Sequence, residues 1–564
     1  MLPPCFASTH KSDRRVFRHV LFLGLLWAMT VIGCPAQTVT TLHDFSNGQD
    51  GDNPAVGLVQ ATDGNLYGTT AFGGANAGGT ALEITPGGTF KSLYSFGYEY
   101  IPSSTLVQAS DRNLYGTTGF GGNEGAGQVF RMTPGGAVTT LYSFCSQPDC
   151  ADGSGPNGGL IQASDGNLYG VTAAGGANSA GTVFRITLDG SLTTLYSFCS
   201  QANCADGSSP EAGIVQDSDG NFYGTTLENG ADGGGTIYRI TPSGTLTTLH
   251  SFCSQANCAD GASPFAGLIQ ANDGNFYGTT YGGGANRNGT VFRITPGGTL
   301  TTLYSFCSQA NCADGAGPRG GLIQATDGNL YGTTTYGGNV NYGTVFKITL
   351  DGTLTTLYSF CSEHDCRDGE YPLASLVQET NGDLYGTTEG SSETAPYGTI
   401  FSLSLGLGPF VEAQTNLGKV GAAIMILGND LIGTTGVSFD GTPANFNVNA
   451  NSYLTATVPN GATTGAITVA APGGTLTSNQ NFRVLPQFTS FSPSSGPVGT
   501  PVTITGVSLT QTTAVTFGGV AASFTVDSDT QVIAMVPVGA RTGAIVITTL
   551  GGSRWSPTAF TVTP

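Results

Sequence analysis

An eight-residue phrase occurs seven times in this chain at a nearly constant spacing. It reads DGNLYGTT at Asp63–Thr70, and close variants begin at residues 111, 165, 219, 273, 327 and 381. The intervals are 48 residues once and then 54 residues five times. A fixed period of this length is typical of a β-propeller or a solenoid, in which every period is one structural unit.

Each unit contains four short segments with the character of β-strands, here called A, B, C and D. In the sixth unit they are residues 321–328, 329–334, 343–349 and 354–360. An Asp-Gly or Asn-Gly pair separates A from B, and this is the strongest short signal for a β-hairpin. Another tight turn, Pro-Gly-Gly or Leu-Asp-Gly, separates C from D. Four strands per unit is the composition of a propeller blade.

The order of the D segments predicts how the ring closes. The first D segment, Thr38–Phe45, precedes every A segment, and no D segment follows residues 398–404 of the last unit. Thr38–Phe45 should therefore pair with residues 398–404, which removes exposed sheet edges. We predict an all-β chain with a seven-bladed β-propeller closed by its N-terminal strand. The alternative is an open β-solenoid.

The repeated phrase has two interpretations. In the structural one, Asp-Gly makes the turn, the following Leu or Phe and the Tyr pack between sheets, and Gly-Thr-Thr continues strand B. In the other, turns such as DSDGN at residues 217–221 bind calcium. Calcium prefers six to eight oxygen ligands, and a two-residue turn supplies too few. We therefore expect no cofactor and keep calcium as the alternative.

The N-terminus has the character of an export signal. The basic segment KSDRRVFRH precedes an apolar run of 14 residues, VLFLGLLWAMTVIG. That run is short for a transmembrane helix, which needs about 20 residues, and no other run is long enough. We expect cleavage after Ala36 and an extracellular or cell-surface protein; the alternative is a lipoprotein attached through Cys34.

Removal of residues 1–36 would leave 14 basic and 36 acidic residues, a net charge of −22. This balance argues against a nucleic-acid partner, which requires a basic surface.

Ten of the 12 cysteines form five Cys-x4-Cys pairs in the segments that join D to the next A. An exported chain meets oxidising conditions, so even and regularly spaced cysteines indicate disulfides. The alternative is a metal site, but two thiolates per loop are too few for tetrahedral zinc, and only His364 lies nearby. The predicted pairs are Cys145–Cys150, Cys199–Cys204, Cys253–Cys258, Cys307–Cys312 and Cys361–Cys366.

The wording DGNLYGTT…GTVFRIT…LTTLYSF resembles the GloVer tandem repeat of exported bacterial proteins, from Thr38 to about Ser404. The resemblance implies no assigned activity and no catalytic residues. The C-terminal wording FTSFSPSSGPVGTPVTITGVSL…AVTFGGVAASF resembles an IPT/TIG immunoglobulin-like domain. A first copy keeps GVSFDGTPANF but lacks the SPSSGPVG turn at its start. The predicted domains are residues 1–36 (signal peptide), 37–406 (propeller), 407–486 and 487–564 (immunoglobulin-like).

Antiparallel strand order places the B–C and D–A loops together at one end of the units, here the loop end. The A–B and C–D turns share the opposite end, here the turn end. Loops on a rigid scaffold commonly carry function. The residue after the proline that precedes each A segment differs in all seven units, and these residues should ring the mouth of the central channel: Ala55, Ser103, Asn157, Glu211, Phe265, Arg319 and Leu373. Further out, the B–C loops carry Phe72, Phe120, Glu228, Tyr281, Tyr336, Tyr342 and Tyr397.

Aromatic residues among scattered polar groups favour a glycan or a surface protein as the partner of a monomeric binding protein. An enzyme would need a nucleophile with a base, or two placed carboxylates. His43 and His250 occupy the Tyr position of the LYSF wording, so we interpret them as structural. Glu211 and Glu228 are the one candidate carboxylate pair. We therefore predict a binding or adhesion protein without catalytic or metal-binding residues. The alternatives are a secreted polysaccharide hydrolase or lyase and a passive structural protein.

Overall fold

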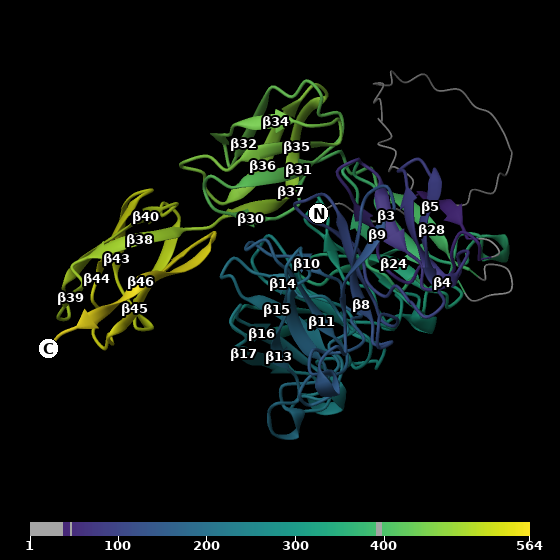
Figure 1. Ribbon diagram of the computed structural model, residues 1–564, viewed down its shortest axis with the longest axis horizontal. Helices are drawn as coiled ribbons and strands as arrows, with labels where there is room; N and C mark the ends of the chain where they lie inside the picture. Colours follow the sequence, from purple (N-terminus) through teal and green to yellow (C-terminus); the bar gives the residue numbers. More distant parts are fainter. Residues whose placement is uncertain (1–37, 46–47, 391–396) are drawn as a thin grey trace, which may run out of the picture. The chain divides into compact units, whose positions relative to one another are not determined.

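The computed structural model describes residues 38–45, 48–390 and 397–564. Every regular element in these residues is a β-strand or a three-residue 3-10 turn (Figure 1). The predicted all-β class is therefore confirmed. The predicted signal peptide, including Cys34, lies outside the described residues.

The repeat region contains seven four-stranded antiparallel sheets, each with its strands in the order A, B, C, D. The A strands are β2 (Val59–Gln60), β6 (Val107–Gln108), β10 (Ile161–Gln162), β14 (Val215–Gln216), β18 (Ile269–Gln270), β22 (Ile323–Gln324) and β26 (Val377–Gln378). The B strands are β3 (Leu66–Thr69), β7 (Leu114–Thr118), β11 (Leu168–Thr172), β15 (Phe222–Thr226), β19 (Phe276–Thr280), β23 (Leu330–Thr334) and β27 (Leu384–Thr388). The C strands are β4 (Ala77–Ile84), β8 (Gln128–Met132), β12 (Thr182–Ile186), β16 (Thr236–Ile240), β20 (Thr290–Ile294), β24 (Thr344–Ile348) and β28 (Thr399–Ser404). The D strands are β5 (Phe90–Gly97), β9 (Val138–Ser143), β13 (Leu192–Ser197), β17 (Leu246–Ser251), β21 (Leu300–Ser305), β25 (Leu354–Ser359) and β1 (Thr38–Asp44).

The predicted pairing of the N-terminal strand is confirmed. Strand β1 lies antiparallel to β28, with partners from Thr38 opposite Ser404 to Asp44 opposite Thr399. The sheet that begins with β26 thus takes its D strand from the other end of the repeat region.

Each sheet packs on the next through a buried apolar cluster. Between the fifth and sixth sheets, Tyr277 and Phe306 pack with Leu330 and Phe346. The same kind of cluster joins the seventh sheet to the first, where Phe45 and Tyr385 pack with Leu66 and Ile84. The seven sheets therefore follow one another in a closed series of contacts.

The glycine of the repeated phrase is required by this packing. A Cβ atom on Gly332 would lie 2.7 Å from the ring of Phe346 on the adjacent strand β24. The B strand must therefore present bare backbone beneath the aromatic ring of strand C.

The aspartate of the phrase holds the A–B turn. The Asp327 carboxylate accepts hydrogen bonds from the Asn329 backbone N–H (3.1 Å), the Asn329 amide (2.7 Å) and the Tyr331 hydroxyl (2.8 Å). Because protein donors already engage both oxygens, the phrase acts as the structural part that the sequence predicts.

The A strands are shorter than the eight residues of segment A. Only Ile323 and Gln324 of residues 321–328 pair with strand B. Before them, the chain instead contacts its neighbouring units, since the Gly321 N–H donates to Ser375 Oγ of the next unit at 2.8 Å. Contacts between units therefore replace the pairing of the first residues of segment A with strand B.

The C-terminal region contains two pairs of sheets with the same strand order. The first pair is β29 (Glu412–Ala413), β31 (Ala423–Leu427), β35 (Tyr453–Thr457) and β34 (Phe446–Val448), with β30 (Leu417–Gly418), β37 (Gly474–Val484), β36 (Gly465–Ala471), β32 (Gly436–Phe439) and β33 (Thr442–Pro443). The second pair is β38 (Gln487–Ser492), β40 (Pro501–Val507), β44 (Gln531–Met535) and β43 (Phe524–Ser528), with β39 (Ser495–Gly496), β46 (Gly552–Val562), β45 (Gly543–Thr549), β41 (Thr512–Phe517) and β42 (Val520–Ala521). The irregular start of the first copy corresponds to a shorter first strand, two residues in β29 against six in β38.

Replacement of residues 38–45 by a Gly/Ser segment of equal length should open the closed series of sheets. The edge of β28 would lose its partner and Phe45 would leave the cluster shared with the first sheet. Loss of a buried Phe alone costs about 3–5 kcal/mol, and an unpaired edge promotes association. Thermal unfolding and size-exclusion chromatography measure both effects. Thr38→Ser with Thr40→Ser, on exposed positions of β1, is the control; a monomer that melts like the parent would contradict the closure.

Candidate functional site

The loop end is built from the D–A and B–C loops, which pair with each other. Short bridges join Ser154 to Ala174 and Ala316 to Tyr336, and three other units repeat this contact. The two loop classes therefore share one end, as the strand order predicts.

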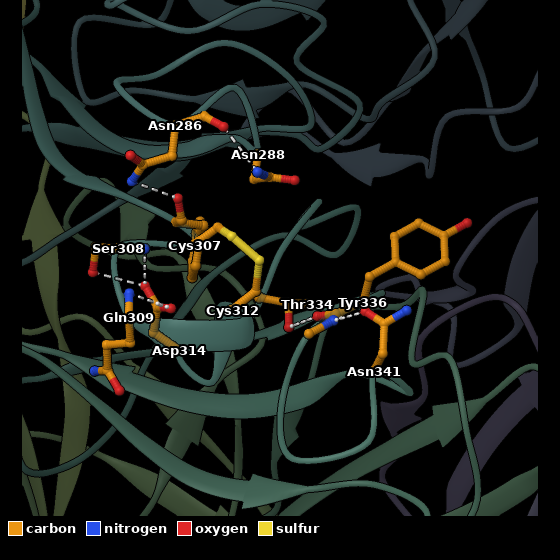
Figure 2. The surroundings of a disulfide bond; sticks show 12 residues. Asn286, Asn288, Cys307, Ser308, Gln309, Cys312, Asp314, Thr334, Tyr336 and Asn341 are labelled. Carbon is orange, nitrogen blue, oxygen red and sulfur yellow. Dashed lines mark hydrogen bonds between the residues drawn. A yellow bond between two sulfur atoms is a disulfide. The ribbon is translucent and has the colours of Figure 1, made fainter.

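The predicted disulfides are all present in the D–A loops. Each closes beside a 3-10 turn, as Figure 2 shows for Cys307–Cys312. The five bonds are Cys145–Cys150, Cys199–Cys204, Cys253–Cys258, Cys307–Cys312 and Cys361–Cys366. The turns are η1 (Pro148–Cys150), η2 (Ala202–Cys204), η3 (Ala256–Cys258), η4 (Ala310–Cys312) and η5 (His364–Cys366).

A buried aspartate organises each disulfide loop, a role that the sequence analysis did not identify. Asp314 accepts hydrogen bonds from Ser308 N–H (2.8 Å), Ser308 Oγ (2.9 Å), Gln309 N–H (3.1 Å) and the Tyr304 hydroxyl (2.8 Å), and Figure 2 shows its carboxylate against Ser308 and Gln309. The signal was present in the sequence, because an aspartate follows the second cysteine of every pair by two residues. The five aspartates are Asp152, Asp206, Asp260, Asp314 and Asp368.

The histidines serve the same structural network. His250 Nε2 lies 3.0 Å from Asp260 Oδ2, where Tyr304 contacts Asp314 in the next unit. His43 likewise contacts Asp50 at 2.9 Å. These contacts are consistent with the interpretation of His43 and His250 as structural residues, which stays a prediction.

The seven variable residues after the prolines are half-buried at the loop end, and each preceding proline is buried. Two groups of them are in contact. Ser103 Oγ donates to the carbonyl of Pro156 (3.2 Å), and Asn157 Nδ2 donates to Glu211 Oε2 (2.8 Å). In the other group, the Arg319 guanidinium lies over the ring of Phe265. Ala55 and Leu373 present only apolar side chains at the loop end.

A second ring lies two residues further along each A segment, and the sequence analysis missed it. Its members are all small because neighbouring backbones approach closely. A Cβ on Gly213 would lie 2.8 Å from the Gly159 carbonyl oxygen, and one on Gly57 would lie 3.2 Å from the Ser375 carbonyl oxygen. The members are Gly57, Thr105, Gly159, Gly213, Gly267, Gly321 and Ser375.

The predicted outer residues differ in exposure. Phe120 and Phe72 are the most exposed, at 59% and 45%, followed by Tyr336 at 37%. Tyr281, Tyr342 and Tyr397 are half-buried, and the Glu228 backbone pairs with Ser208.

Aromatic side chains from the fifth to seventh units form two groups near Arg319. The Arg319 guanidinium carbon lies 5.1 Å from the Phe265 ring centroid and 5.0 Å from that of Tyr281. Tyr336 and Tyr342 each pack edge-on against Tyr371, at 5.8 and 5.2 Å. Tyr371 was not among the predicted residues, although it replaces the Ser or Gly of four other units.

Glu211 and Glu228 lie close enough to interact electrostatically. Burial raises the pKa of Glu211, the hydrogen bond from Asn157 opposes this, and the charge of Glu228 adds to the rise. Among the residues that the structure describes, no cluster of three His, Cys, Asp or Glu could hold a metal ion. Within that same part of the chain, no helix has the length and apolarity to cross a membrane.

The turn end contacts the first C-terminal pair of sheets. The residue after the A-strand glutamine is alanine in five units, and the exceptions are Asp217 and Glu379. Arg483 of β37 pairs with Asp217 at 2.9 Å and also bonds Gln270. Burial and the charge of Glu379 together raise the pKa of Glu412, in β29, to about 7. Both departures from the repeat therefore coincide with contacts to the following domain.

Comparison with known proteins identifies two kinds of module. A family model described as the Gloeobacter/Verrucomicrobia repeat matches residues 23–205, 199–401 and 313–480, and an IPT/TIG domain model matches residues 486–563. No curated protein matches the chain.

Several solved structures show a distant likeness. One is a surface glycan-binding protein from Prevotella bryantii, with 18% identity over 26% of this chain and 38% of that chain and a TM-score of 0.21. Another is a fungal alcohol oxidase in complex with copper, with 12% identity over 79% of this chain and 98% of that chain and a TM-score of 0.45. With TM-scores below 0.5, these likenesses assign neither a fold nor an activity to this chain.

The charge of Asp314 should stabilise the folded protein at neutral pH. Burial alone would raise its pKa, but hydrogen bonds from Ser308 and Tyr304 outweigh burial and lower the pKa below 3.8. A depressed folded-state pKa stabilises above the unfolded-state value, and this contribution is lost as the pH falls through the folded-state value. Asp314→Asn should therefore cost about 2 kcal/mol at pH 7 and progressively less toward pH 2, measured by urea unfolding. An equal cost at both pH values would contradict this.

Asp217→Ala restores the alanine of the other units, yet it should destabilise the protein. It leaves the largely buried Arg483 without its anion, and breaking such a pair costs about 3–5 kcal/mol. In an Arg483→Met background the same change should be nearly neutral. Urea unfolding of the four full-length variants gives the coupling energy, and an equal cost in both backgrounds would exclude the pairing.

Proposed function

Because the chain belongs to the Gloeobacter/Verrucomicrobia repeat family, whose repeat specifies the constant part of every sheet, we propose that function resides in the residues that the repeat leaves free. The protein is a monomeric, exported binding protein that holds a partner at its loop end without chemical turnover. That partner is a glycan or a surface protein.

In this proposal, residues 37–406 form a seven-bladed β-propeller, and residues 407–486 and 487–564 form two immunoglobulin-like sandwiches. Three observations support the propeller: the seven sheets of four strands, the pairing of β1 with β28, and the shared cluster of the seventh and first sheets. The ring of small residues adds to this, since Gly57 contacts both Thr105 and Ser375.

One observation carries the functional proposal. The seven mouth residues are equivalent by position in the repeat and are all half-buried at one end, yet no two are the same residue. Structural positions elsewhere in the unit keep their residue type, as the buried prolines do. A ring of unlike residues on a constant scaffold is the arrangement that a ligand site requires.

The turn end fits this assignment because it is already occupied in part. Side chains within its constant turns hydrogen-bond to one another, and several of its units contact the following domain, for example through Thr62, Asp217 and Gln270. The loop end is thus the end available to a partner. Export accords with the five disulfides, which persist in oxidising compartments.

A polysaccharide hydrolase or lyase is the second candidate function, and the interaction between Glu211 and Glu228 favours it. Such an enzyme would use one carboxyl group as an acid and the other as a base or nucleophile. A passive structural protein is the third candidate and predicts no ligand at all.

Binding to the loop end is tested by screening residues 37–564 against a glycan panel and cell-envelope fractions. Phe265→Ala with Arg319→Ala should abolish capture of the retrieved ligand while the melting temperature stays within a few degrees of the parent. Asn65→Ala at the turn end is the control, because the Asn65 side-chain amide donates to Asp63 and Glu83, and its loss should lower stability but spare binding. Normal binding by the double variant would refute the proposal, and a chemically altered ligand would favour the enzyme.

A further inference from the structure

Arg319 is a cation at the loop end that the repeat does not require. The equivalent positions carry apolar, neutral polar or acidic residues, and this is the single unit with a base there. By contrast, Lys347 occupies a position on strand C that is basic in most units, and it lies 4.0 Å from Asp327 of its own turn. The charge of Arg319 therefore has no role in building the sheet.

The surroundings of Arg319 leave its charge unbalanced. Its guanidinium lies over the adjacent rings of Phe265 and Tyr281, and its Nε–H is buried without a hydrogen-bond partner among the described residues. It forms no ion pair with any other described residue. Cation–π contacts contribute about 0.5–2 kcal/mol. They do not replace the hydrogen bonds to water that the buried part of the guanidinium has lost. A carboxylate would supply the missing interaction, because its two coplanar oxygens match the N–H groups of a guanidinium.

Further aromatic residues follow Arg319 in the B–C loop of its own unit and in the D–A loop that leads to the next unit. Gly317 lies next to the rings of Tyr281 and Tyr336, and its φ is +59°. A Cβ atom there would be 3.0 Å from the Tyr281 ring and 3.4 Å from the Tyr336 ring. The glycine thus allows both rings to approach. The Tyr336 ring is partly exposed and extends away from the disulfide in Figure 2. It packs edge-on against Tyr371, which also contacts Tyr342. Several amphipathic rings from neighbouring loops therefore gather near Arg319.

We propose that the loop end binds an acidic polysaccharide, with Arg319 holding a hexuronate carboxylate and the rings of Tyr281 and Tyr336 stacking on neighbouring sugars. This proposal rests on the proposed binding function and specifies its ligand class. Sugar rings present apolar C–H faces to aromatic rings and hydroxyl groups to tyrosine, so several half-exposed tyrosines on neighbouring loops suit a chain of sugars.

The net charge of the protein restricts the class of acidic ligand further. The protein has a formal net charge of −19, so a densely charged polyanion or acidic peptide is repelled at long range. A polysaccharide in which neutral sugars separate the hexuronates offers one carboxylate to Arg319 with less repulsion along the rest of its length.

The test uses the full mature chain and matched polymers. Hyaluronan, xanthan and gellan oligosaccharides are each compared with their carboxyl-reduced counterparts by isothermal titration calorimetry. At least one acidic form should bind about 10- to 100-fold more tightly than its reduced form, the factor expected for a charge-assisted hydrogen-bonded pair.

Arg319→Gln should remove that difference and leave binding of the reduced polymer nearly unchanged. Arg319→Lys keeps the charge without the planar fork and should retain part of the difference. Arg293→Gln, on strand C opposite Thr301, is the matched control and should bind like the parent. The ratio of the affinities for the acidic and the carboxyl-reduced polymer separates recognition of the carboxylate from a general effect on the loops.

The outcomes separate the two proposals. If the loop end captures a neutral glycan or a protein and Arg319→Gln has no effect, the acidic polysaccharide is excluded while the binding function stands. If no glycan and no envelope component binds, both proposals fail. Equal affinity for the acidic and reduced polymers also overturns the role of Arg319.

Discussion

The pairing of β1 with β28 is the contact on which the rest of the structure depends. In a row of similar units, every sheet has a successor except the last, and here a strand from the opposite end of the repeat region completes that last sheet. Phe45 then packs against the first sheet as its equivalents pack against theirs. Because the backbone is held in this way, seven unlike residues at the loop end do not disturb the fold.

Much of this fold is predictable from the sequence, because each unit repeats its turn residues and apolar positions. The Asp-Gly turns, the D strand taken from the N-terminus and all five disulfides follow from spacing. The length of the A strands does not, because near the small-residue ring the chain bonds to neighbouring units, as Gly321 does to Ser375. The apolar pattern of one unit predicts which side chains pack between sheets, but not which backbone groups hydrogen-bond to the next unit.

The candidate site is less predictable, and the reason is physical. Variation among the units identifies the mouth residues, but not which of them touch. That Arg319 lies over the rings of Phe265 and Tyr281 depends on the exact course of three loops from adjacent units. The pairing of Arg483 with Asp217 joins residues 266 positions apart, although Asp217 stood out in the sequence as an acid where most units have alanine. Residues that depart from the repeat are identified in the sequence as candidates for a special role. Their contacts are identified only in the structure.

The composite last sheet has a genetic consequence. Its two sources lie at opposite ends of the repeat region, so recombination that adds or removes one internal 54-residue unit leaves both of them intact in the gene. The number of internal units can therefore change while the gene still encodes both β1 and β28. In the proposed propeller, the number of units would also set the inner circumference. The close backbone contacts of Gly57, Gly213 and their equivalents would then limit which numbers of units can close.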